Sequence, residues 1–336
     1  MANKIGCFLV SPLLAVIIAD SLQADPYTLG DGWQLGNSPY YVGGYFSVDY
    51  WHDEQGNSGF GLYDAAVMLY GSEGAWSVMS EVELSDPYVR RFGEEAYSES
   101  DLTLHAERVY AHYESSEYWN ATIGKFNTPV GYWNLMPINV LRDTTSSPLV
   151  VSRIFPRFTT GGDLYITAGS PEFNFLVQVT PDIDTVFNGD NIYNNFDIDK
   201  QIGAGMELAD GGWSYRVNAG AYEERRVSQS WGYLYGATEF RSEAFHLMAE
   251  TGYRQNKENT QSAFGAYVQG TQTIALRHFA VLRLEYMNEY IPQSEDSIAI
   301  IGYTYRPVFP VALKGEYQFH SLHSENEVLL SFSMLF

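Results

Sequence analysis

The sequence has little cysteine, few basic residues and no long apolar run beyond its start, and each shortage excludes a class of protein. The 336 residues include one cysteine, Cys7, so the rest of the chain has no disulfide, thiolate metal site or cysteine nucleophile. Lysine and arginine number 19 against 41 aspartate and glutamate residues, for a formal net charge of -22. This acidity argues against nucleic acid as a partner. Beyond residue 24 the sequence lacks the apolar run of about 20 residues that a membrane-spanning helix requires.

The N-terminal residues have the three parts of an export signal. Lys4 supplies a positive charge, Ile5 to Ala19 an apolar stretch, and Leu22-Gln23-Ala24 a cleavage site, the order found in secretory signal peptides. We therefore predict that residues 1–24 are a cleaved signal peptide. Residues 25–40, which are rich in Gly, Asp and Pro, are interpreted as a periplasmic lead-in.

The chain is rich in aromatic residues, and in many segments its apolar residues alternate with polar ones. There are 26 tyrosines, 19 phenylalanines and 7 tryptophans, while the mean hydropathy is -0.21. This combination is typical of membrane β-barrels, in which one face of each strand contacts lipid and the other contacts the lumen. Residues 41–52 illustrate the pattern: Val42, Phe46, Val48 and Tyr50 share one face, and Tyr45, Ser47, Asp49 and Trp51 share the other. We assign the first face to lipid, so that Asp49 faces a water-filled lumen.

The same alternation recurs along the chain and predicts an all-β fold, a transmembrane antiparallel β-barrel. We expect strands at residues 41–52, 60–70, 75–85, 102–114, 118–127, 161–169, 173–180, 200–208, 213–222, 231–240, 245–254, 263–271, 278–289, 297–306, 311–320 and 327–336. Sixteen is preferred, and merging or missing one hairpin would give 14 or 18. The long connectors 87–101, 128–160 and 181–199 then all fall on the outer side. Charged residues on both faces of 102–114 predict a β-bulge there.

The last predicted strand, within the barrel that we place at 41–336, ends on an aromatic residue. Phe332, Met334 and Phe336 share one face of it. A terminal phenylalanine preceded by alternating apolar residues resembles the assembly signal of Gram-negative outer-membrane barrel proteins. The resemblance implies location in that membrane, with lipid, lipopolysaccharide and the barrel assembly machinery as partners. The alternative is an edge strand of a soluble β-sandwich.

Residues 128–160 break the alternation. This connector of 33 residues is longer than ordinary loops, and many of its residues need a surface to pack on. They are Leu135, Met136, Ile138, Val140, Leu141, Leu149, Val150, Val151, Ile154 and Phe155. Because a barrel of about sixteen strands has a wide aqueous lumen, we predict that the segment folds inward as a constriction loop.

The start of this segment resembles a known family. Gly124-Lys-Phe126 followed by Pro129-Val-Gly131-Tyr-Trp133 is similar to the Gly-Lys/Arg-Phe and Pro-Phe-Gly stretch of porins of the phosphate-selective O and P group, with Val130 where phenylalanine is usual. The resemblance implies a sixteen-strand porin whose third outer loop enters the lumen. It also implies passive diffusion of small hydrophilic solutes or ions, a homotrimer, no enzymatic reaction and no cofactor.

Charged residues are the candidate determinants of permeation. Those in or next to the loop are Lys125, Arg142, Asp143, Arg153 and Arg157. Those expected on lumen faces of the wall are Asp49, Glu81, Glu83, Arg216, Glu250, Arg283, Glu285, Lys314 and Glu316. Loop guanidinium groups opposite wall carboxylates would create a transverse field. The alternative is that Arg142 pairs with Asp143, and the other basic groups pair with wall acids, only to hold the loop. The sequence leaves both possibilities, and the sign of selectivity, open.

Two other groups of residues suggest different chemistry. Asp182, Asp184 and Asp190 could offer oxygen ligands to Ca²⁺, although a solvated acidic loop is the simpler interpretation. His320, Ser321 and His323 form the one cluster of serine and histidine. An outer-membrane enzyme acting on lipid or peptide would need such a pair with an orienting acid. A plugged structural barrel is the other alternative to a porin.

Overall fold

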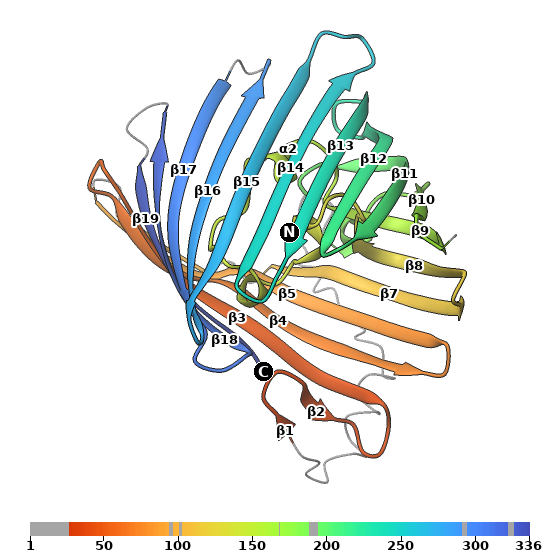
Figure 1. Cartoon of the computed structure of the whole chain (residues 1–336), viewed down its shortest axis with the longest axis horizontal. Coiled ribbons are helices and arrows are strands. Elements are labelled where there is room, and N and C mark those ends of the chain that lie inside the picture. Colours follow the sequence, from red (N-terminus) through yellow and green to blue (C-terminus); the bar gives the residue numbers. More distant parts are fainter. Residues whose placement is uncertain are drawn as a thin grey trace, which may run out of the picture.

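A computed structural model describes residues 27–93, 97–100, 103–167, 169–187, 194–290, 294–321 and 326–336. Within these ranges sixteen antiparallel strands form a closed barrel (Figure 1). They are β3 (Tyr40–Asp53), β4 (Ser58–Glu73), β5 (Trp76–Phe92), β7 (Leu104–Ser116), β8 (Trp119–Asn127), β9 (Phe158–Thr167), β10 (Glu172–Gln178), β11 (Ile198–Asp210), β12 (Trp213–Glu224), β13 (Gln229–Arg241), β14 (Phe245–Asn256), β15 (Ser262–Ala275), β16 (His278–Glu289), β17 (Ser294–Tyr305), β18 (Val311–His320) and β19 (Glu327–Leu335). The predicted all-β barrel and its preferred strand number are confirmed.

The last strand closes the barrel on the first. β19 pairs with β3 from Glu327 opposite Asp53 to Leu335 opposite Tyr45. Phe336 then continues the ladder, since its N–H and C=O each bond the backbone of Gly44 at 2.7 Å. A Cβ atom on Gly44 would lie 2.8 Å from the Phe336 ring, so a residue without a side chain is needed at this point of the seam.

The predicted lead-in contains a hairpin that the sequence did not indicate. β1 (Tyr27–Thr28) pairs with β2 (Gly32–Gln34), and β2 pairs with β3 through Trp33 opposite Val42. The hairpin therefore covers the edge of β3 beyond the point where Phe336 ends. Strands of two and three residues are too short to produce a recognisable alternation.

Side chains of β3 alternate between the lumen and the outside of the barrel, as predicted. Tyr45 and Ser47 are buried on the lumen side, whereas Val48 and Tyr50 are exposed on the outside. In β7 the register shifts between Glu81 opposite Arg108 and Val82 opposite Ala106. Glu107 is thus an extra residue, which confirms the predicted bulge and explains the charges in both phases.

The connectors differ sharply in length at the two ends of the barrel. The connector between β8 and β9 spans 128–157 and contains η1 (Trp133–Leu135), η2 (Asn139–Leu141) and α2 (Leu149–Arg153), and that between β10 and β11 contains α3 (Asp184–Phe187). The long connector predicted at 87–101 is partly wrong. β5 continues to Phe92, and β6 (Tyr97–Glu99) pairs back onto it. None of the helices in the described ranges is long and apolar enough to cross a membrane.

Candidate functional site

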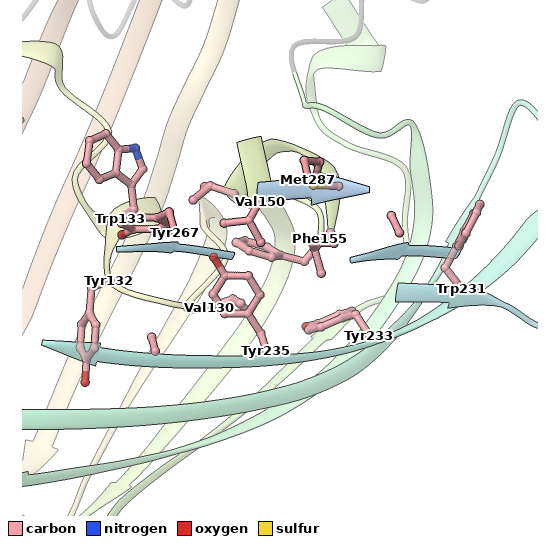
Figure 2. Close-up of a cluster of buried hydrophobic side chains, with 14 of the residues drawn as sticks. Val130, Tyr132, Trp133, Val150, Phe155, Trp231, Tyr233, Tyr235, Tyr267 and Met287 are labelled. Atoms are coloured by element: carbon pink, nitrogen blue, oxygen red, sulfur yellow. The ribbon is translucent and has the colours of Figure 1, made fainter. Parts of the chain in front are cut away.

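Residues 128–157, called the third connector below, pack against one inner wall of the barrel (Figure 2). Phe155 lies edge-on to Tyr235, with ring centroids 5.0 Å apart and planes at 82°. Val150 and Ile154 belong to the same buried cluster, and α2 contacts β14, β15 and β16. Each fully buried side chain of this size contributes about 1.5–3 kcal/mol, so apolar contact holds the connector on this wall.

A second, smaller contact lies on another part of the wall. Ile138 and Val140 of the third connector pack with Tyr45 of β3, Met68 of β4 and Ala312 of β18. The connector therefore extends from the β13–β16 wall to the seam region of the barrel. Both contact surfaces are formed by lumen-facing side chains, so the chain between them lies within the barrel.

Three predicted wall carboxylates accept hydrogen bonds from the connector backbone. Glu250 accepts from the N–H groups of Tyr132 and Trp133, both at 2.8 Å. Glu285 accepts from Leu149 N–H at 2.8 Å. Glu316 accepts from the N–H groups of Thr145 and Ser146 at 2.9 and 3.1 Å. These backbone donors belong to irregular segments and short helical turns, where they lack the partners of a regular helix.

Three predicted wall cations contact the connector in the complementary way. Arg216 donates to Gly131 C=O at 2.7 Å. Arg283 donates to Thr144 Oγ1 at 2.7 Å, and Lys314 donates to Asn139 Oδ1 at 2.7 Å. Six of the nine predicted wall residues thus bind the third connector directly.

Arg306 was not singled out from the sequence, yet it belongs to the same set. Its guanidinium donates to Arg142 C=O at 2.8 Å and lies 3.4 Å from the Asp143 carboxylate. Asp143 also accepts from Thr271 at 3.0 Å and lies 3.9 Å from His246 Nδ1. Arg306 follows β17 directly at a short turn, where a basic residue is easily interpreted as a surface residue.

Arg142 is bound by its own connector. It donates to the carbonyl groups of Met136 at 2.7 Å and Pro137 at 2.6 Å and to Ser147 Oγ at 3.2 Å, all within the connector, and Asp143 is held by other groups. Burial lowers the pKa of Arg142 to about 10, and repulsion from Arg157 adds to this, while Asp64 and Glu107 oppose it. The group therefore stays cationic at neutral pH.

The remaining loop arginines are less tightly held. The Arg157 guanidinium lies over the Phe158 ring, with its central carbon 5.6 Å from the ring centroid, and is half-buried. The Arg153 side chain is 53% exposed and lies 3.7 Å from a Glu289 oxygen. Both groups therefore keep freedom to move that Arg142 lacks.

Three carboxylates from β5 and β7 converge on one part of the wall. Carboxylate oxygens of Glu81, Glu83 and Glu107 lie within 4.8 Å of one another, and each residue is at most 2% exposed. The Tyr45 hydroxyl lies 2.8 Å from an oxygen of Glu83 and of Glu107, and Arg108 pairs with Glu81. Among the described residues this is the group whose oxygen donors could hold a hard cation. Asp49 is half-buried on β3, which β4 separates from β5, and Asp64 of β4 accepts from Ser47 at 2.8 Å.

Lys125 has a different position from the one expected. It is fully buried, with Nζ 2.9 Å from Asp182 Oδ1 and 2.9 Å from Asp184 Oδ2. Although burial raises the pKa of Asp184, hydrogen bonds from His105 and Lys125 outweigh it and lower the pKa below its usual value. The lysine ammonium thus stands between two of the carboxylates considered for calcium, and Asp190 lies outside the described residues.

The connector between β10 and β11 covers the third connector. Asn195 donates to the carbonyl groups of Ser152 and Phe155, both at 2.8 Å, and accepts from Arg157 N–H at 2.8 Å. Asn194 donates to Phe158 C=O at 2.9 Å. The two connectors are therefore joined as one unit.

His320 and Ser321, at and just after the end of β18, both contact the same carboxylate. His320 Nδ1 lies 2.8 Å from Asp296, and Ser321 donates to the same carboxylate at 3.3 Å. In a hydrolase triad the histidine lies between the serine and the acid, so this order differs from that of a nucleophilic site. His323 lies outside the described residues.

Comparison with solved structures identifies the fold. An anion-selective porin from Comamonas acidovorans has a TM-score of 0.64 at 12% identity, over 88% of this chain and 99% of that one. Salmonella typhi OmpF has a TM-score of 0.65 at 10% identity, over 88% and 97%. The trimer form of OmpT, an outer membrane protein of Vibrio cholerae, has a TM-score of 0.58 at 10% identity, over 88% and 99%.

The fold is that of the porins. At such low identity the likeness concerns the fold alone. No family model matches the sequence, and no curated protein matches it.

Proposed function

We propose that the chain is a passive channel of the Gram-negative outer membrane, which carries small hydrophilic solutes or ions through a barrel narrowed by the third connector. The observation that carries the proposal is the placement of opposite charges within one closed barrel. Arg142 and Arg157 belong to the connector, and Asp64 and Glu107, whose charges act on Arg142, belong to the wall. Buried or lumenal charges are useful in a membrane protein chiefly along a solute path.

This opposition of charges would act as the selectivity element. A field across the passage orients dipolar solutes, and the balance of guanidinium and carboxylate groups biases it toward one sign of ion. The connector is held by backbone hydrogen bonds to Glu250, Glu285 and Glu316, which would keep the passage at a fixed width.

The export signal predicted at 1–24, the outward apolar faces and the trimeric OmpT neighbour support an outer-membrane homotrimer. Phe332, Met334 and Phe336 remain the proposed assembly signal. Lipopolysaccharide and the assembly machinery are partners on the same grounds.

The test is single-channel recording in a planar bilayer, with a salt gradient to obtain the reversal potential. Steady open steps with a signed reversal potential would support the channel. A plugged barrel is the second candidate, because the β10–β11 connector is bonded over the third connector. Folded protein that gives no conductance would favour the plug and reject the channel.

A further inference from the structure

A cavity of about 390 Å³ lies between the third connector and the wall opposite its apolar contacts. Pro129 and Leu135 line it from the connector, and Arg108, Asp163 and Tyr165 are among the residues that line it from β7 and β9. Sites for small molecules in proteins have volumes of about 300–1,000 Å³. The cavity is thus large enough for one small solute, and it lies on the lumen side of the barrel.

Two of the residues that line the cavity have hydrogen-bond donors without acceptors. Arg108 Nη2 and Asn127 Nδ2 are inaccessible and have no partner among the described residues. Buried donors in folded proteins are nearly always satisfied. A ligand that brings acceptor oxygens would satisfy both after small side-chain rotations.

The charges that line the cavity do not favour an anionic ligand. The Arg108 guanidinium is already paired with Glu81, so its charge is balanced. Asp163 is 5% exposed and accepts a single hydrogen bond of 3.4 Å, from Asn174 to Oδ1, among the described residues. Its second oxygen can accept from a ligand, which therefore must donate as well as accept. Hydroxyl groups do both.

Aromatic side chains complete the lining. Tyr110, Tyr165 and Phe126 contribute rings to the same cavity. An aromatic face packs well on C–H groups while a tyrosine hydroxyl bonds polar groups at its tip. Vicinal hydroxyls on a carbon ring present both kinds of surface to these residues.

We propose that this cavity is a binding site for a neutral polyhydroxylated solute, such as a mono- or disaccharide, on its way through the barrel. Arg108, Asn127 and Asp163 would bind its hydroxyls, and Tyr165 would pack on its ring. The inference rests on the proposed function, since the solute reaches the site along the channel.

The experiment measures block of the ion current of the protein in planar bilayers by maltose and by glucose, with sulfate as the anionic probe. Either sugar is expected to reduce the current reversibly and to add current noise. Asp163→Ala removes hydrogen bonds to a charged group, and Tyr165→Leu removes the ring. Each is expected to raise the half-blocking sugar concentration about tenfold.

Milder variants guard against misfolding. Asp163→Asn and Tyr165→Phe keep the shape of the wall and should give shifts in the same direction but smaller. Tyr253→Phe, on the exposed outer face of β14, is the matched control and should leave sugar block unchanged. Equal sugar block in all variants would overturn the proposal, as would block by sulfate with none by sugar.

Calorimetric titration of the detergent-solubilised protein with maltose separates this inference from the proposed function. Open channels without sugar block or heat of binding would reject the site and leave the channel. Heat of binding that Asp163→Ala abolishes, in a protein that never conducts, would keep the site and reject the channel.

Discussion

The two sides of the third connector differ in what they contact. On the β13–β16 side Phe155, Ile154 and Val150 are buried against tyrosine and methionine side chains. On the other side the charges of Asp64 and Glu107 act on Arg142, and Pro129 and Leu135 line a cavity of about 390 Å³. The first side provides the larger apolar contact that holds the connector, with a smaller one at Ile138 and Val140 near the seam, and the second side offers polar groups to a solute. The comparison suggests that stability and permeation are assigned to different walls of one barrel.

The largest effect should come from breaking the holding side. Phe155→Ala removes a fully buried ring from the apolar cluster, which costs about 3–5 kcal/mol. We expect faster proteolysis of the connector and larger, noisier conductance steps, while the barrel stays folded. Phe264→Ala on the exposed outer face is the control, and an equal effect of both substitutions would contradict the distinction between the walls.

Next in size is the loss of a polar anchor. Glu250→Gln weakens two charge-assisted bonds to the N–H groups of Tyr132 and Trp133, each contributing about 1.5–3 kcal/mol. Denaturant unfolding in lipid vesicles should give a lower free energy of unfolding, with altered conductance. Glu223→Gln, whose side chain is 41% exposed, should change neither, and unchanged stability of Glu250→Gln would remove the anchor role.

The permeation side should respond in ion selectivity. Removing a unit charge about 4 Å from a permeating ion changes its energy by about 1 kcal/mol in water, or roughly fivefold in permeability ratio. Arg142→Gln and Arg157→Gln should therefore raise the cation-to-anion ratio, and Glu107→Gln should lower it. Reversal potentials that stay the same in all three variants would exclude these residues from the passage.

The smallest effect is expected from acidification, through protonation of Asp143. Burial raises the pKa of Asp143, but hydrogen bonds from His246 and Thr271 and attraction from Arg306 outweigh it and lower the pKa. A lowered pKa gives stability that is present above the unfolded value of about 3.9 and lost as the pH falls through the folded value. The stability that Asp143 contributes, measured by denaturant unfolding against pH, should thus be constant down to about pH 4 and decrease below it. Asp143→Asn should remove this acid-dependent change, and an unaltered profile would show that another group is responsible.

The barrel could be predicted from the sequence because each strand carries its own signal. Period-two alternation in β3 placed Tyr45 and Ser47 inside and Val48 and Tyr50 outside, as the structure confirms. The β1–β2 hairpin could not be predicted in this way, since three residues in β2 hold no periodicity.

The partners of the charged residues were harder to predict. Lys125 pairs with Asp184 across 59 positions, and Arg283 binds Thr144 across 139. Such pairs depend on which strands become neighbours and on where a connector folds, and neither leaves a local pattern. Charged groups of the wall do bind this connector, but their part in permeation stays a prediction.

The most direct test of the division between the walls uses single cysteines, because Cys7 is the only cysteine in the sequence and lies in the predicted signal peptide. Leu135→Cys and Asp64→Cys belong to the permeation side, and Val151→Cys and Met287→Cys to the buried side. A charged, water-soluble thiol reagent should reduce the current through the first two channels and leave the last two unchanged. Rapid modification of Val151→Cys and Met287→Cys, with Leu135→Cys and Asp64→Cys unaffected, would contradict the account.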